Sequence, residues 1–115
     1  MHGICWAEFL VKDAAASAKF LSDLFGWQTK QWGDRNYYFW KNESDKLSGG
    51  LDPNMPPNTQ TLVYVEVEDV KATVEKTRAL GGGVIAKYCP LGDNMGVYAI
   101  ITTPEGTTIG IWGKQ

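Results

Sequence analysis

Apolar and polar residues alternate along two short stretches of this chain, and each stretch leads into a segment with helical spacing. The first stretch is Cys5–Val11 and the second is Leu62–Val67. Alternation with a period of two is typical of a β-strand that buries one face. Each strand leads to an aspartate, Asp13 or Asp69, whose side chain can accept hydrogen bonds from the first amides of a helix. The pattern therefore predicts a strand and then a helix, twice.

The two predicted helices are Ala14–Phe25 and Val70–Leu80. Their apolar residues recur every few positions, as expected for one buried stripe on each helix. The predicted stripes consist of Ala16, Phe20, Leu21 and Leu24 in the first helix and Val70, Val74 and Leu80 in the second. Glycines end both helices, at Gly26 and at residues 81–83, because glycine adopts a positive φ at low cost.

Further strands are predicted after each helix, at residues 27–32, 36–41 and 47–51 in the first half and 84–88, 97–103 and 107–112 in the second. A shift of 56 positions places Val11 on Val67 and Asp13 on Asp69, so the halves read as a repeat. The predicted fold class is α+β, with two tandem βαβββ modules at about residues 3–51 and 61–113. A proline-containing linker, residues 52–60, joins them within a single domain, residues 1–115.

Strand alternation also sorts side chains by face. The wholly apolar faces of the first strands, with Ala7, Phe9 and Val65, are expected to carry the helices. The opposite faces hold a mixture of aromatic, aliphatic and acidic residues, namely Trp6, Glu8, Leu10, Leu62, Tyr64, Glu66, Gly110 and Trp112. Such a mixture is typical of a small-molecule pocket. An interface between two copies of the chain is the alternative, and a pocket shared across a dimer would satisfy both readings.

Glu8 is the candidate catalytic residue, because its apolar neighbours would raise the pKa of its carboxyl group and suit it to general acid or base chemistry. The alternative is a carboxylate that anchors a ligand or shapes the cavity. Glu66 has the same two interpretations nearer to a strand end. Aromatic residues that could stack on a planar ligand are Tyr38, Trp40, Tyr64, Tyr98 and Trp112, although core packing explains any one of them equally well.

Composition removes several function classes. The 115 residues carry a net charge of −2 with scattered basic residues, so no nucleic-acid partner is expected. We expect no membrane-spanning segment and no export signal, and therefore a cytoplasmic protein without a membrane partner. Cys5 and Cys89 form no metal-binding or disulfide pattern. The single histidine, His2, excludes nucleophilic triads built on histidine elsewhere in the chain.

Four segments carry a family resemblance: Trp6–Asp13, Phe20–Trp27, Val65–Val70 and Thr103–Gly106. Through them the chain resembles the vicinal oxygen chelate superfamily, which includes glyoxalase I, bleomycin-resistance proteins and extradiol dioxygenases. The resemblance extends over essentially the whole chain. It implies paired βαβββ modules that form a half-barrel, often assembled as a homodimer with ligand sites between modules.

In metal-dependent members of that superfamily, His or Glu residues from both modules bind a divalent ion. The resemblance puts the corresponding positions at Trp6, Leu62, Gly110 and either Gly49 or Gly50, and none of these side chains can coordinate a metal. His2, or a relocated site with Glu8 and Glu66, is a weaker candidate for metal binding. We therefore expect no metal and no cofactor.

The leading functional hypothesis is a metal-independent protein that binds an aromatic or amphipathic small molecule, as a homodimer. The alternative is a lyase or isomerase of the same superfamily that uses Glu8 as general base or a relocated metal site. A third hypothesis is a purely structural dimer with a filled interior. Whether the chain is an enzyme stays open at the level of sequence.

Overall fold

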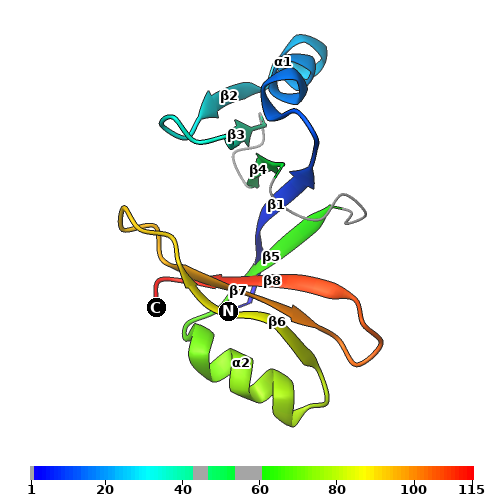
Figure 1. The fold of residues 1–115 in the computed structure, drawn as a ribbon, viewed down its shortest axis with the longest axis vertical. Helices are drawn as coiled ribbons and strands as arrows, with labels where there is room; N and C mark the ends of the chain where they lie inside the picture. Colours follow the sequence, from blue (N-terminus) through cyan, green and yellow to red (C-terminus); the bar gives the residue numbers. More distant parts are fainter. Residues whose placement is uncertain (1, 43–46, 54–60) are drawn as a thin grey trace. The chain divides into compact units, whose positions relative to one another are not determined.

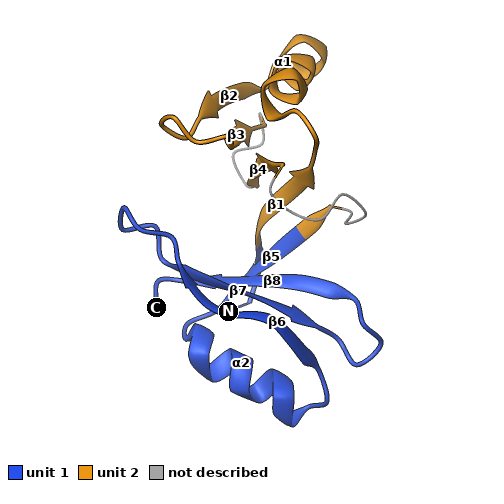
Figure 2. Ribbon diagram, in the orientation of Figure 1, with its two compact units in different colours: residues 1–4, 63–115 blue, residues 5–62 orange. Residues whose placement is uncertain are grey.

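The computed structural model describes residues 2–42, 47–53 and 61–115. It contains two compact units, which follow the two predicted modules (Figure 1, Figure 2). The N-terminal unit, orange in Figure 2, is Cys5–Leu62, and the C-terminal unit, blue, is Met1–Ile4 with Val63–Gln115. In its described part, each unit contains one helix and four strands. Among the described residues, no helix is long and apolar enough to cross a membrane.

The order of helices and strands is βαβββ in both halves, as the sequence predicts. The elements are β1 (Ile4–Leu10), α1 (Ala14–Phe25), β2 (Gln28–Gln31), β3 (Tyr38–Lys41), β4 (Ser48–Asp52), β5 (Leu62–Glu66), α2 (Val70–Ala79), β6 (Gly83–Pro90), β7 (Val97–Thr102) and β8 (Thr108–Gly113). The α+β fold class with two βαβββ modules is therefore confirmed. Most of the predicted linker, residues 54–60, lies outside the described residues.

Both helices begin where the sequence predicts. The Asp13 carboxylate accepts a hydrogen bond from the amide of Ala16 at 3.0 Å, and the Asp69 carboxylate accepts one from the amide of Ala72, also at 3.0 Å. These bonds satisfy amides that have no partner within the helix. Gly26 ends α1 with a φ of 72°, a conformation that a side chain would strain.

The sheet of the N-terminal unit has the strand order β2-β3-β4-β1, with β1 parallel to β4 and the other pairs antiparallel. Its register pairs Glu8 with Gly50 and Gly50 with Phe39. The neighbouring row pairs Ala7 with Gly49, and Gly49 with Trp40. Because directly opposite residues point to the same side of a sheet, Glu8 and Phe39 share one face, which we call the Glu8 face. Ala7 and Trp40 share the other face.

The predicted buried stripe of α1 is wrong. The helix buries Ala14 and Ala18, whereas Phe20 is 62% exposed and Leu24 is 57% exposed. Helical spacing shows which residues share a side of the helix, but it does not show which side meets the sheet. In α2 the predicted Val70 and Val74 are buried, and Leu80 is 70% exposed at the helix end.

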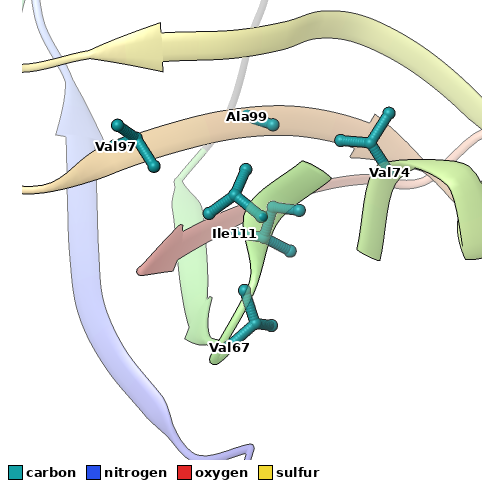
Figure 3. Packing of buried hydrophobic residues seen from close by; sticks show 6 residues of the cluster. Val67, Val74, Val97, Ala99 and Ile111 are labelled. Atoms are coloured by element: carbon teal, nitrogen blue, oxygen red, sulfur yellow. The ribbon is translucent and has the colours of Figure 1, made fainter. Parts of the chain in front are cut away.

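The sheet of the C-terminal unit has the order β5-β8-β7-β6, with β5 parallel to β8 and the other pairs antiparallel. Its core lies between this sheet and α2 and contains Val67, Val70, Val74, Val97, Ala99 and Ile111. Figure 3 shows how these small aliphatic side chains from the helix and strands gather in one layer. Val67, directly after β5, belongs to this core, so the predicted helix-facing side of the stretch Leu62–Val67 is confirmed.

Candidate functional site

Glu8 is a buried carboxylate in the middle of β1, with only 6% of its surface exposed. Its Oε2 accepts a hydrogen bond of 2.6 Å from the hydroxyl group of Tyr37. The Tyr37 oxygen in turn accepts a hydrogen bond of 3.3 Å from the indole Nε1 of Trp6. A hydrogen bond to a carboxylate is stronger than one between neutral groups, and a chain of such bonds holds each member in one orientation. Glu8 is thus held by Tyr37, and Tyr37 by Trp6.

Gly50 makes room for this arrangement. A Cβ atom at position 50 would overlap the hydroxyl oxygen of Tyr37. Gly50 also lies directly between Glu8 and Phe39 in the sheet register, so the Tyr37 hydroxyl occupies the place where a side chain on β4 would stand. The glycine therefore permits the hydrogen bond between Tyr37 and Glu8.

Four half-buried rings contact one another beside Glu8, and we call them the aromatic cluster: Trp6, Trp32, Tyr37 and Phe39. Trp6 meets Phe39 edge to face, with 5.9 Å between ring centroids and 80° between planes. Tyr37 meets Phe39 at 5.4 Å and Trp32 at 5.7 Å, both edge to face. These are favourable geometries for aromatic pairs. Since each ring keeps part of its surface exposed, the cluster offers apolar walls to a ligand.

The structure places Tyr38 and Trp40 away from Glu8. Trp40 is 3% exposed and stacks between Phe9, at 5.5 Å, and Trp27, at 4.7 Å. For Trp40, core packing is therefore the interpretation that holds. Tyr38 pairs with Leu51 in the register and lies on the same side of the sheet as Trp40. Among the described residues, the indole Nε1 of Trp40 has no hydrogen-bond partner.

Sequence reasoning missed Tyr37, Phe39 and Trp32. Residues 37–40 are four aromatics in a row, and such a run does not show which alternate pair faces which side. Phe39 faces the same side as Glu8 because both residues stand opposite Gly50, one on each side of β4. This depends on the strand register, which the sequence does not show. A usable signal in the sequence was the charge of Lys41, which lies two positions after Phe39 and therefore indicates that their shared side of the strand meets solvent.

In the C-terminal unit, several predicted residues lie together on the face opposite α2. Tyr64 is 8% exposed and meets Tyr98 edge to face at 6.3 Å. Glu66, Trp112 and Tyr98 stand opposite one another in the register, so they share this face. Glu66 is exposed, unlike Glu8. Leu62, at the start of β5, is 1% exposed.

Trp112 and Gly110 are fixed by close contacts within that unit. The indole Nε1 of Trp112 donates a hydrogen bond of 2.8 Å to the main-chain oxygen of Met95. The ring of Tyr64 lies over Gly110, where a Cβ atom would overlap it. Gly110 therefore contributes to this face by letting the Tyr64 ring approach the backbone.

A groove lies on the other side of the N-terminal sheet, between α1 and the strands. It has a volume of about 510 Å³ and is lined by Phe9, Val11, Lys12, Asp13, Ala16, Ser17, Phe20, Leu21 and Leu51. Its charged residues stand at the start of α1, where the Asp13 carboxylate already caps the helix. The walls are otherwise mainly apolar, so this groove lacks the buried polar anchor that Glu8 gives to the opposite face.

Comparison with known proteins agrees with the fold and with the repeat. The family profile described as "Glyoxalase/Bleomycin resistance protein/Dioxygenase superfamily" matches residues 3–111. The chain belongs to this superfamily. Two mycobacterial proteins named "Putative glyoxylase CFP32", from Mycobacterium bovis and Mycobacterium tuberculosis, are 30% identical to it over 117 residues. The match covers 93% of this chain and 44% of theirs, so the chain spans less than half the length of these relatives.

Solved structures share the fold at low sequence identity. A hypothetical protein from Bacillus halodurans superposes with a TM-score of 0.76 at 10% identity, covering 99% of this chain and 95% of that one. A glyoxalase/bleomycin resistance protein/dioxygenase superfamily member from Vibrio splendidus gives a TM-score of 0.68 at 14% identity, covering 98% of each chain. At these identities the likeness concerns the fold alone.

The superfamily positions for metal ligands do not fit a metal in this chain. At the first position, the Trp6 indole donates its N–H to Tyr37 and offers no lone pair. Any side chain at Gly50 would displace the Tyr37 hydroxyl, and any side chain at Gly110 would displace the Tyr64 ring. Within the described part of the chain, no three His, Cys, Asp or Glu side chains are grouped so that they could hold a metal ion.

Proposed function

We propose that this superfamily member binds an aromatic or amphipathic small molecule without a metal ion. The observation that carries the proposal is the buried Glu8 carboxylate, held by the Tyr37 hydroxyl at 2.6 Å within a cluster of half-buried rings. A site with mainly apolar walls and one fixed polar group is what small-molecule recognition requires. The carboxylate supplies a hydrogen-bond acceptor, and the rings supply surfaces for stacking.

A binding experiment tests this proposal on the purified chain. Quenching of tryptophan fluorescence is followed while small aromatic compounds are added, and native mass spectrometry reports any compound or metal that remains bound after gentle purification. We expect saturable binding that weakens about tenfold in Glu8→Gln, the factor for a lost hydrogen bond to a charged group. Glu105→Gln, an exposed carboxyl in a turn of the C-terminal unit, is the matched control. Stoichiometric metal together with turnover of a superfamily substrate would overturn the proposal.

The second candidate function is a lyase or isomerase in which Glu8 is the general base. The burial of Glu8 and its contact with a second proton-carrying group, the Tyr37 hydroxyl, favour this candidate. Loss of turnover in Glu8→Gln with unchanged ligand affinity would support it. A rate that is the same in wild type and Glu8→Gln would exclude Glu8 as the base.

We also propose that the chain forms a homodimer. Support comes from α1, which exposes three large apolar residues, Phe20 at 62%, Leu24 at 57% and Phe25 at 52%. Apolar side chains grouped on one helix are a common property of surfaces that associate.

A cytoplasmic location, which the sequence suggests, remains part of the proposal and is tested by fractionation of cells that express the chain.

A further inference from the structure

Strands β2 and β3 of the N-terminal unit carry two charged residues, and both lie on the Glu8 face. They are Lys30 in β2 and Lys41 in β3, and both are exposed. Lys30 stands directly opposite Phe39 in the register. Lys41 stands opposite Ser48, which stands opposite Trp6. Because opposite residues share a face, the two lysines flank the aromatic cluster.

A third cation stands at the turn that connects these strands. The guanidinium carbon of Arg35 lies 4.1 Å from the centroid of the Trp32 ring, a member of the aromatic cluster. The turn is held by hydrogen bonds from the Arg35 amide to the Trp32 oxygen, at 3.0 Å, and from the Gln31 side chain to the Arg35 oxygen, at 3.0 Å. Asp34 is the only acidic residue between positions 28 and 41, against three basic ones.

Strands β1 and β4 carry negative charges on the same face. Glu8 lies in β1, and Asp52 at the end of β4 stands opposite Leu10, two positions after Glu8. The Glu8 face therefore carries acidic residues on β1 and β4 and basic residues on β2 and β3. Glu8 and Lys30 lie in one row of the register, three strand spacings or roughly 14 Å apart at the backbone. Both side chains are long, and the ring of Phe39 stands between them.

We propose that the Glu8 face selects a planar aromatic ligand with a hydrogen-bond donor at one end and an anionic group at the other, such as a hydroxyaryl carboxylate. The proposal rests on the small-molecule binding function given above. Glu8 accepts the donor, the ligand ring packs on Trp6 and Phe39, and the anionic group meets Lys30 and Arg35. Arginine is suited to this role, because its planar guanidinium forms paired hydrogen bonds with a carboxylate.

Four compounds separate the two polar contacts from stacking alone. They are 4-hydroxybenzoate, benzoate without the donor, 4-methoxybenzoate with the donor blocked, and 4-hydroxybenzamide without the charge. Dissociation constants are measured by isothermal titration calorimetry on the full chain. We expect 4-hydroxybenzoate to bind about tenfold or more tightly than each of the other three, the factor for one hydrogen bond to a charged group.

Variants assign each preference to its residue. In the double variant Lys30→Gln with Arg35→Gln, the preference for 4-hydroxybenzoate over 4-hydroxybenzamide should disappear. In Glu8→Gln, the preference for 4-hydroxybenzoate over 4-methoxybenzoate should fall. Lys30 and Arg35 are exposed, so their replacement should leave the fold intact. Lys87→Gln, which replaces an exposed lysine of β6, is the matched control.

Three failures are distinguishable. If the four compounds bind equally well and the variants change no preference, the ligand class proposed here is wrong while small-molecule binding stands. If no aromatic compound binds even at millimolar concentration, both proposals are wrong. Binding of all four compounds that persists in Glu8→Gln and in Trp6→Leu would move the site away from the Glu8 face and would also overturn the inference.

Discussion

At the scale of single residues, three contacts fix the position of the Tyr37 hydroxyl group. It donates to the Glu8 carboxylate at 2.6 Å and accepts from the Trp6 indole at 3.3 Å, and it occupies the space above Gly50. A hydroxyl has one proton to donate, so this donation leaves the group only as an acceptor for Trp6. The orientation of Glu8 in the absence of a ligand therefore depends on Tyr37.

Replacement of Tyr37 by Phe should destabilise the fold by about 1–3 kcal/mol, because it removes a donor from a buried carboxylate and leaves the Trp6 indole without its acceptor. Urea denaturation measures the change. In the same variant, the NMR resonance of the Trp6 indole N–H should shift, because this group loses its hydrogen-bond acceptor. A change in side-chain volume alone would not produce this shift. Tyr88→Phe is the matched control, because the Tyr88 ring packs against the core of the C-terminal unit and contacts Lys71. Equal stability of Tyr37→Phe and wild type would contradict the hydrogen-bond chain.

Replacement of Gly50 by Ala should also destabilise the chain, by about 1–3 kcal/mol, because the added methyl group and the Tyr37 hydroxyl cannot share one place. The same change in a Tyr37→Ala background should cost less, since alanine removes both the hydroxyl oxygen and the ring carbons that a Cβ atom at position 50 would overlap. This double-mutant cycle isolates the contact between the two positions. Gly3→Ala is the control, because a Cβ there meets nothing within 4 Å. Strictly additive costs would show that Tyr37 does not lie over Gly50.

The residue scale also shows how far the sequence could lead. It correctly separated Glu8 and Trp6 from Ala7 and Phe9, since β1 alternates regularly and one of its faces is wholly apolar. It could not separate Tyr37 and Phe39 from the neighbouring aromatics, because both parities of that run are equally apolar. Only the pairing across β4 relates their faces to that of Glu8.

At the scale of helices and strands, α1 shows the same limit. Its bounds and both of its ends follow from local chemistry, namely the Asp13 cap and the left-handed Gly26. The side that it buries depends on what the sheet presents, and α1 turns its alanines inward. The large rings of Phe9, Trp27 and Trp40 already fill that side of the sheet with stacked contacts. Small helix residues fit against such a layer, which spacing alone does not reveal.

Substitutions along α1 should follow the observed burial. Leu24→Gln, at a position 57% exposed, should change the stability of the monomeric chain by less than about 0.5 kcal/mol, as measured at a dilution that dissociates the proposed dimer. Ala18→Leu, at a position 3% exposed, should cost about 1–3 kcal/mol, since the added atoms have no space. Thermal and urea denaturation of both variants give the comparison. A larger loss for Leu24→Gln than for Ala18→Leu would mean that α1 packs with its other side.

The ion pair on α1 gives a prediction that depends on pH. The hydrogen bond from Lys19 to Asp23, and then the charge of Asp23, raise the pKa of Lys19 above its ordinary value of 10.5. A raised pKa in the folded state contributes stability below pH 10.5, and that stability is lost as the pH rises through the raised value. In Asp23→Asn the pKa of Lys19 should fall toward its ordinary value. Titration of the Lys19 side chain by NMR measures it, and an unchanged pKa would show that the pair does not form in solution.

At the scale of the whole molecule, the repeat is the feature that the sequence revealed most directly. Both halves have the predicted βαβββ order, and the superfamily profile spans nearly the whole chain. The identity of the ligand has no such signal, because aromatic side chains build cores and binding faces alike. In this chain Trp40 belongs to the first kind, and we propose that Trp6 belongs to the second. The single domain and the ligand sites between modules that the resemblance implies stay predictions.

The proposed homodimer is tested by its mass in solution. Light scattering coupled to size-exclusion chromatography should give twice the chain mass of 12.7 kDa at micromolar concentration. Phe20→Lys should shift the equilibrium to the monomer, because it places a charge on the exposed apolar side of α1, where Phe20 is 62% exposed. Leu80→Lys is the matched control, since Leu80 is a similarly exposed apolar residue, at 70%, in the other unit. A monomer at all concentrations would refute the dimer. A dimer that survives Phe20→Lys would instead show that association uses another surface, and the apolar side of α1 would then need a different explanation.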